Sequence, residues 1–244
     1  MSAYWSLLIL SQTTDGQSGE PLYSHSEPTQ ILILDDIVDG PYWEMWSLIA
    51  SDPPRRLPNL DSQSINHSIP IGKMIVPLPG GSNPFWQGDW INLNCTSSTL
   101  LEDFSRKALD QYNISPMVEV DSNAPITLTY INRVIKRRLQ LHISATTDIL
   151  VGVHGAGLTH AMFLPNGGGT IVELMPFNVD HHGFKNLAKM RSLQYYQAKT
   201  ADAKHKTQAK GNWQDDDVWV DQRAFMATIR EAIENLRRTR RFTK

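Results

Sequence analysis

The sequence contains a single cysteine, Cys95, among its 244 residues. One cysteine excludes an intramolecular disulfide and any zinc site built from cysteine ligands. No stretch is apolar over the roughly 20 residues that a membrane-spanning helix requires. The N-terminal run MSAYWSLLIL has neither a preceding cationic segment nor a small-residue cleavage site, so the residues alone favour a cytosolic protein.

The chain also lacks a charge excess. It has 23 lysine and arginine residues against 25 aspartate and glutamate residues, a formal net charge of −2. Because nucleic-acid-binding domains usually carry a basic face, this balance gives no case for nucleic acid as a partner. The short basic runs at 136–138 and 237–241 favour a solvated helix face or tail over a binding patch.

The central stretch, residues 148–176, has the pattern of a strand, a tight turn and a helix. Ile149–Val153 is a continuous, largely β-branched run, which predicts a buried strand of a parallel sheet. The glycine-rich turn at 155–157 lets the backbone bend sharply and approach a ligand closely. Residues 158–164 then have helical character until Pro165 ends the helix.

A second buried strand is expected at Thr170–Leu174, and it carries one carboxylate, Glu173. Because ligands of open α/β sheets bind outside the carboxyl ends of the strands, we expect His154, the glycine turn and Glu173 to face one crevice. A helix N-terminus with free amides suits a phosphate. The same glycines are also explained by close packing of a helix on a strand with no ligand present.

The N-terminal part predicts smaller elements. We expect a buried helix at 4–11, a buried strand at 30–35 that ends in acids, an aromatic helix at 42–50 and a short strand at 73–77. The aromatic loop at 85–90 either lines an acceptor groove or fills a surface depression, and the residues favour neither.

Between this part and the central stretch lies an amphipathic helix that starts at Thr99, the expected cap, and ends near Tyr112. The linker at 116–125 indicates a domain boundary. A strand at 126–131 then ends at Asn132 and Arg133, before a helix at 136–144. Arg133 is expected at the same rim of the sheet as His154, where a guanidinium suits a diphosphate.

After Glu173 the pair His181 and His182 follows Asp180, which raises the possibility of a metal site. Adjacent residues point in opposite directions on a helix or strand, so we expect no metal here. The remaining elements are a helix at 184–191, a short strand at 194–197 and an amphipathic terminal helix at 222–238 with a structural role.

Residues 148–164, with the turn His-Gly-Ala-Gly-Leu-Thr-His and the helix end Phe-Leu-Pro, closely resemble the signature of glycosyltransferase family 61. The resemblance extends to four further segments of the family. They are an aspartate-containing strand with an aromatic helix (31–46), an Asn-Cys turn with its helix (92–114), an arginine-terminated strand (126–133) and a closing helix (218–232). Within the family, the chain looks most like a divergent, fungal-like form of the group that adds O-linked N-acetylglucosamine to EGF domains.

This resemblance implies an α/β fold of the GT-B-like type, with two Rossmann-type halves around a cleft. It implies an inverting transfer of GlcNAc from UDP-GlcNAc to a serine or threonine hydroxyl of a protein, such as an EGF-like domain, without a resident cofactor or a required metal. The implied location is the lumen of the endoplasmic reticulum or Golgi, where the three glycosylation sequons at Asn66, Asn94 and Asn113 would matter, although chance alone gives one or two.

Carried across position by position, the resemblance assigns Arg133 and the turn His154, Gly155, Ala156, Gly157 and Leu158 to the diphosphate, and Glu173 to the ribose hydroxyls. The general base is not identified. Asp35, Asp36 and Asp39 are candidates by their position at a strand end, and capping of the following turn explains them equally well.

Two departures from the family accompany the match. Members carry a larger N-terminal half with a signal or anchor, and a longer segment in place of 133–148. We therefore expect residues 1–120 to be a remnant of an acceptor-side domain with a linker, and 121–244 to be a nucleotide-sugar-binding domain. The alternative is a catalytically inactive fragment that acts as an interaction module, or the product of a mispredicted gene.

Overall fold

The computed structural model describes residues 1–38, 43–56, 72–77, 89–115, 124–131, 141–176, 179–199 and 218–242. The chain forms two compact units, residues 1–83 and residues 84–244. The second unit contains a parallel sheet flanked by helices, so the α/β class predicted from the sequence is confirmed.

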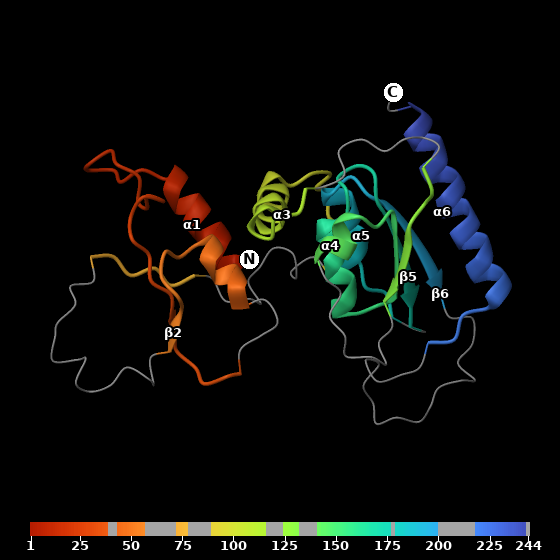
Figure 1. Cartoon of the computed structure of the whole chain (residues 1–244), viewed down its shortest axis with the longest axis horizontal. Helices are drawn as coiled ribbons and strands as arrows, with labels where there is room; N and C mark the ends of the chain where they lie inside the picture. Colours follow the sequence, from red (N-terminus) through yellow and green to blue (C-terminus); the bar gives the residue numbers. More distant parts are fainter. Residues whose placement is uncertain are drawn as a thin grey trace. The chain divides into compact units, whose positions relative to one another are not determined.

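The sheet of the second unit has four parallel strands in the order β3-β4-β5-β6 (Figure 1). They are β3 (Leu128–Ile131), β4 (Ile149–Val153), β5 (Thr170–Met175) and β6 (Gln194–Lys199). Each strand follows its neighbour in the chain, with a crossover between them. In the register, Gly152 of β4 lies opposite Glu173 of β5, which lies opposite Gln197 of β6.

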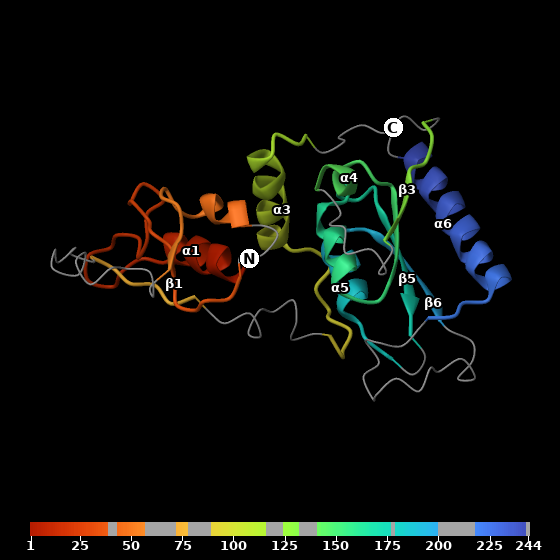
Figure 2. The same cartoon turned by 60° about the horizontal axis from the view of Figure 1, so that its bottom comes forward.

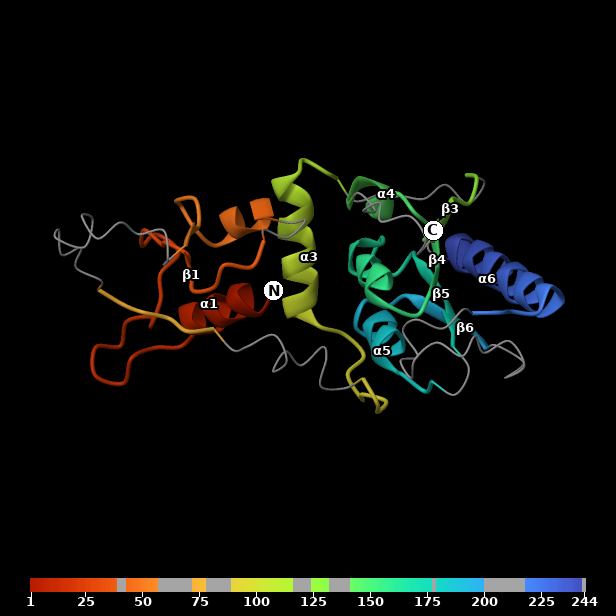
Figure 3. The ribbon, with the colours of Figure 1, turned by 90° about the horizontal axis from the view of Figure 1, so that it is seen from below.

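One face of the sheet is covered by the terminal helix α6 (Gln222–Phe242), as Figures 1 and 3 show. The core on this face combines strand residues with residues of α6: Ile149, Val151, Val172, Ile229, Ala232 and Leu236. These side chains are 0 to 7% exposed, so the expected structural role of the terminal helix is confirmed. Tyr196 of β6 packs against the same cluster.

The α6 helix is also held by a buried ion pair. The guanidinium of Arg240 bonds the carboxylate of Asp148, the residue that precedes β4. The other oxygen of Asp148 accepts a hydrogen bond from the backbone N–H of Thr127, at 2.7 Å. Both side chains of the pair are at most 5% exposed, so this contact joins the end of α6 to the sheet away from water.

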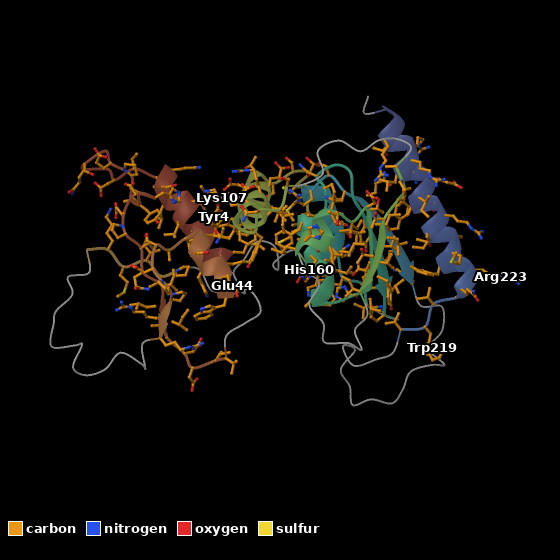
Figure 4. The ribbon with its side chains drawn as sticks, in the orientation of Figure 1. Tyr4, Glu44, Lys107, His160, Trp219 and Arg223 are labelled. Atoms are coloured by element: carbon orange, nitrogen blue, oxygen red, sulfur yellow. The ribbon has the colours of Figure 1, made fainter. Side chains whose placement is uncertain are left out.

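The opposite face of the sheet carries α4 (Leu141–Ala145), η5 (Ala156–Phe163) and α5 (Gly183–Met190), and α3 (Thr99–Gln111) packs against η5 (Figure 2). The buried hydroxyl of Ser105 in α3 donates to the backbone oxygen of Met162 in η5 at 2.6 Å. In Figure 4, His160 of η5 and Arg223 of α6 lie on the two sides of the sheet.

The predicted elements around the central stretch are largely confirmed. Strand β4 has the expected bounds, and β5 extends one residue beyond Leu174. The helix after the glycine turn is a 3₁₀ helix that starts at Ala156, earlier than expected. The predicted cap of α3 is wrong by one residue, because Ser98 rather than Thr99 accepts the hydrogen bond from Leu101 N–H.

The boundary between the two compact units lies at 83/84, whereas the sequence predicts a domain boundary at 120/121. The difference concerns α3, which contacts η5 and α4 and carries the buried residues Leu101, Phe104, Ala108 and Leu109. Helix α3 therefore belongs to the same compact unit as the sheet. The acceptor-side and donor-side roles given to the two parts stay predictions.

The first unit begins with the expected helix, α1 (Ser2–Gln12), which buries Tyr4, Trp5 and Leu7. The aromatic helix is the 3₁₀ helix η1 (Trp43–Leu48). The strand predicted at 30–35 is present only as the two-residue β1 (Leu32–Ile33), which pairs among the described residues with the two-residue β2 (Arg55–Arg56). Its predicted burial is wrong, because Leu32 is 38% exposed.

The strand predicted at 73–77 is also wrong, because these residues form no ladder and Met74 and Val76 are 72% and 83% exposed. An apolar run becomes a strand only where a neighbouring strand satisfies its backbone groups. Within the described part of the chain, no helix is long and apolar enough to cross a membrane.

Candidate functional site

The candidate site centres on Glu173, which is fully buried near the carboxyl end of β5. Its Oε1 lies 2.5 Å from Nδ1 of His154, and its Oε2 accepts a hydrogen bond of 2.5 Å from the hydroxyl of Tyr195. The three residues come from three adjacent strands or strand ends. Val172 and Tyr196 face α6, so the next residue in β5, Glu173, and the preceding residue in β6, Tyr195, face the other side of the sheet. The strand register thus brings the side chains of Glu173 and Tyr195 together.

The electrostatics of Tyr195 fix the direction of one of these hydrogen bonds. Burial raises the pKa of the Tyr195 phenol far above its usual range, and the neighbouring Glu173 carboxylate raises it further. The hydroxyl therefore stays protonated and donates to Glu173. A carboxyl group with a hydrogen-bond partner at each oxygen is well satisfied in the interior, where an unpaired polar group would be costly.

His154 directly follows β4, is 3% exposed and is enclosed by other rings. Its ring centre lies 4.4 Å from that of His181 and 5.5 Å from that of Phe184. These contacts and the Nδ1 contact to Glu173 restrict the imidazole to one orientation.

His181 lies between His154 and Asp89 and contacts both. Its Nε2 lies 3.3 Å from Oδ2 of Asp89, and its Nδ1 accepts a hydrogen bond of 3.2 Å from Gly183 N–H. Burial lowers the pKa of His181, and the nearby His154 lowers it further. Trp90 covers the ring edge-on, with centroids 5.0 Å apart.

Asp89 is 9% exposed, and burial raises the pKa of its carboxyl group against the opposing effect of His181. Its backbone oxygen accepts from His182 N–H at 2.5 Å, so residue 89 is attached to the start of α5. A Cβ at Gly183 would come within 2.6 Å of Oδ1 of Asp89, which leaves room only for glycine there. Oδ1 has no hydrogen-bond partner among the residues described.

The glycines of the turn serve two different purposes. Gly155 has φ of 148° and ψ of 179°, a backbone conformation that side-chain-bearing residues rarely adopt. At Gly157, a Cβ would lie 2.9 Å from Cγ2 of Ile131, so this glycine allows η5 to pack against the end of β3. Close packing therefore accounts for Gly157, whereas Gly155 is required by the turn itself.

The turn also presents backbone donors. Within the described part of the chain, the N–H groups of Gly155, Ala156 and Gly157 donate no hydrogen bond, whereas Leu158 N–H donates to Gly155 O at 3.0 Å. These amides start the eight-residue η5 helix. Such amides attract an anion, and they lie directly beside His154 in the chain.

The structure thus brings together His154, the glycine turn and Glu173, three of the features that the sequence assigns to a donor site. Leu158 is fully buried in the packing of η5. His160, the second histidine of the motif, contacts the backbone oxygen of Gly157 through Nδ1 at 3.0 Å. Arg133, expected at the same rim, lies outside the described residues.

The carboxylates considered as general bases lie in the first unit. Asp35 and Asp36 follow β1 and are exposed, and Asp39 lies outside the described residues. The Oδ1 atom of Asp35 accepts from Ile37 N–H at 3.1 Å, the turn-capping contact that was the alternative explanation. The assignment of these aspartates as bases stays a prediction.

Two neighbours of the site carry no recognisable sequence signal. The sequence around Tyr195 has only the pattern of a short strand, and Asp89 lies in an aromatic loop. Only the tertiary fold brings these two residues close to His154. His181 was considered as a metal ligand, and it pairs with Asp89. In the described ranges, no group of three or more His, Cys, Asp or Glu side chains is placed to hold a metal ion.

No protein-family model matches the chain. Part of it is similar to several proteins named EGF domain-specific O-linked N-acetylglucosamine transferase. The Drosophila melanogaster protein is 50% identical over 56 residues, which are 23% of this chain and 10% of that protein. The Mus musculus protein is 43% identical over 56 residues, with the same shares of both chains.

The Gallus gallus protein of the same name is 32% identical over 91 residues, 37% of this chain and 17% of that protein. The chain therefore spans only 10 to 17% of the length of these relatives. The resemblance predicted from the central motif is confirmed for this group of transferases, as a partial similarity.

Proposed function

We propose that the second unit is the nucleotide-sugar-binding part of an inverting O-glycosyltransferase, which moves GlcNAc from UDP-GlcNAc to a serine or threonine hydroxyl of a protein. The observation that carries this proposal is the buried His154–Glu173 pair beside the unpaired amides of the glycine turn, at the carboxyl end of β4. The partial similarity to EGF domain-specific transferases supports the same reaction and suggests an EGF-like domain as the acceptor.

The chemistry of the reaction fits such a site. As the acceptor oxygen attacks C1 of the sugar, the bond from C1 to the phosphate oxygen breaks and its electron pair stays on the diphosphate. Stabilising this negative charge lowers the barrier, and preorganised N–H donors do so without reorganising. In the proposal, the turn amides, His154 and Arg133 hold the diphosphate, so that no metal is required.

The proposal includes finer points that follow from the resemblance. The chain would be a member of glycosyltransferase family 61 with a GT-B-like arrangement, and it would act in the lumen of the secretory pathway. Inversion requires one general base near the acceptor hydroxyl. Asp35, Asp36 and Asp39 are the sequence-based candidates for that base.

Donor binding tests the proposal first. Isothermal titration calorimetry with UDP-GlcNAc should show binding to the chain, and Arg133→Ala should weaken it about 10- to 100-fold, as expected for loss of a charge-assisted hydrogen bond. Arg223→Ala, a change of the same type at an exposed position of α6, is the matched control and should bind normally. If the unaltered chain binds neither UDP-GlcNAc nor UDP, the donor site does not exist.

Transfer is a separate question. A folded EGF-like domain incubated with the chain and UDP-GlcNAc should gain one N-acetylhexosamine, detected by mass spectrometry. Donor binding without transfer to EGF-like domains or other protein acceptors would instead favour the inactive interaction module.

A further inference from the structure

Glu173 was expected to contact the ribose of the donor, but its two oxygens are already occupied by protein groups. Oε1 contacts His154 and Oε2 accepts from Tyr195, each at 2.5 Å, and the residue is fully buried. A direct contact with a ribose hydroxyl would require one of these short hydrogen bonds to be shared or broken. The carboxylate therefore lies behind the surface that a ligand reaches.

Through its contact with His154, this carboxylate can influence a ligand that it does not touch. In the arrangement that we infer, Oε1 of Glu173 accepts this hydrogen bond and Nδ1 of His154 donates it. In an imidazole, Nε2 lies on the opposite side of the ring from Nδ1, so Glu173 determines where Nε2 points. The rings of His181 and Phe184 prevent the imidazole from rotating away.

We infer that Glu173 is a positioning residue: held by Tyr195, it accepts a hydrogen bond from Nδ1 of His154 and fixes this imidazole beside the glycine turn that would bind the diphosphate, without touching the donor itself. The inference rests on the proposed function, because the diphosphate is the ligand that the turn would hold. It replaces the ribose contact expected for Glu173 with an action through His154. Tyr195 gains a role that the sequence did not indicate.

The first test needs no ligand. In ¹⁵N-histidine spectra of the free chain, His154 should show a proton on Nδ1 with the downfield resonance of a hydrogen bond to a carboxylate. Tyr195→Phe keeps the carboxylate and should keep this proton on Nδ1. Glu173→Gln removes the charge and leaves one acceptor oxygen for two donors, so the resonance should move upfield or disappear.

An unprotonated Nδ1 of His154 in the unaltered chain would overturn the inference, whether or not the variants fold. The same conclusion would follow if Glu173→Gln left the Nδ1 resonance unchanged. Circular dichroism and amide exchange of β4 and β5 verify that each variant is folded before its spectrum is compared.

The second test separates positioning from ribose contact by comparing UDP with its 2′-deoxy and 3′-deoxy forms. Positioning predicts that Glu173→Gln weakens binding of all three by the same factor, about tenfold, because the lost interaction does not involve the ribose. A direct contact predicts that the unaltered chain prefers UDP and that the variant loses this preference, which would refute positioning. Absence of UDP binding to the unaltered chain would reject the proposed function instead, while the histidine spectra still test the role of Glu173.

Discussion

Two apolar runs of similar composition, Ile31–Leu34 and Ile149–Val153, have opposite outcomes in this chain. In the first unit, Leu32 and Leu34 are 38% and 73% exposed. In the second unit, Ile149 and Leu150 are completely buried. The difference arises from the neighbours that each run meets rather than from its own residues.

The second run has partners on every side. Strand β4 pairs with β3 and β5, one of its faces packs on α6, and the other contacts η5. In the described part of the first unit, β1 has only the two-residue β2 beside it. A site that depends on fixed geometry therefore belongs in the second unit, where the burial of the surrounding side chains restricts movement.

The largest difference between the units is expected for their ion pairs. Arg240→Met removes the partner of a buried Asp148 and should lower the free energy of unfolding by about 3–5 kcal/mol, because the charge stays in the interior. Lys73→Met removes an exposed pair with Glu27 in the first unit and should cost about 1 kcal/mol or less. Urea unfolding combined with amide exchange of each unit measures both changes, and equal effects would contradict the comparison.

Truncation of a leucine in each run is the next test. Leu150→Ala creates a cavity at a fully buried position of β4 and should destabilise the sheet by about 2–5 kcal/mol. Leu34→Ala alters an exposed side chain and should change stability by about 0.5 kcal/mol at most. A large loss from Leu34→Ala would show that the first run is buried in solution after all.

Glycine substitutions test the packing of the turn. Gly157→Ala brings a methyl group to within 2.9 Å of Ile131 and should destabilise the second unit by about 1–3 kcal/mol. Gly16→Ala, in the first unit, meets nothing within 4 Å and should be neutral or slightly stabilising. Thermal unfolding distinguishes the pair, and a neutral Gly157→Ala would indicate that η5 packs less closely than the structure shows.

The smallest expected effect concerns acid pH. The folded-state pKa of His181 is lowered, chiefly by burial, so its contribution to stability is present above the unfolded value of about 6.5 and is lost as pH falls toward the folded value. The pKa of the Asp89 carboxyl group is raised, so this group adds stability as pH falls and opposes the effect of His181. His154 and Glu173 also lie near the His181 ring. The protection factors of the α5 amides, which correct for the slower intrinsic exchange at acid pH, should fall below about pH 6.5, and His181→Asn should reduce this fall.

The sequence predicted the parts of the site that depend on local pattern. Strands β4 and β5 follow from their continuous apolar, β-branched runs, and the turn follows from its glycines. The strand ends predict that His154 and Glu173 face the same crevice, but not that the two side chains contact each other. The donation from Tyr195 and the pairing of His181 with Asp89 were not, because they depend on register and on long-range packing.

The wrong sequence predictions also arise where long-range packing, rather than local pattern, determines the structure. The runs at 30–35 and 73–77 have the apolar character of strands, and only the absence of covering layers around their described residues makes them exposed. Ser98 and Thr99 are adjacent and both residue types are able to cap a helix. The backbone conformation of the chain before the helix determines which of the two does so, and the sequence does not show it.

The most direct test of the account is hydrogen exchange of the whole chain with and without saturating UDP. The donor-site proposal predicts slower exchange of the amides at 155–157, since these N–H groups would bond the diphosphate, and unchanged exchange of the peptide covering 31–38 in the first unit. Equal exchange at 155–157 in the presence and absence of bound UDP would contradict the central claim that this turn holds the nucleotide.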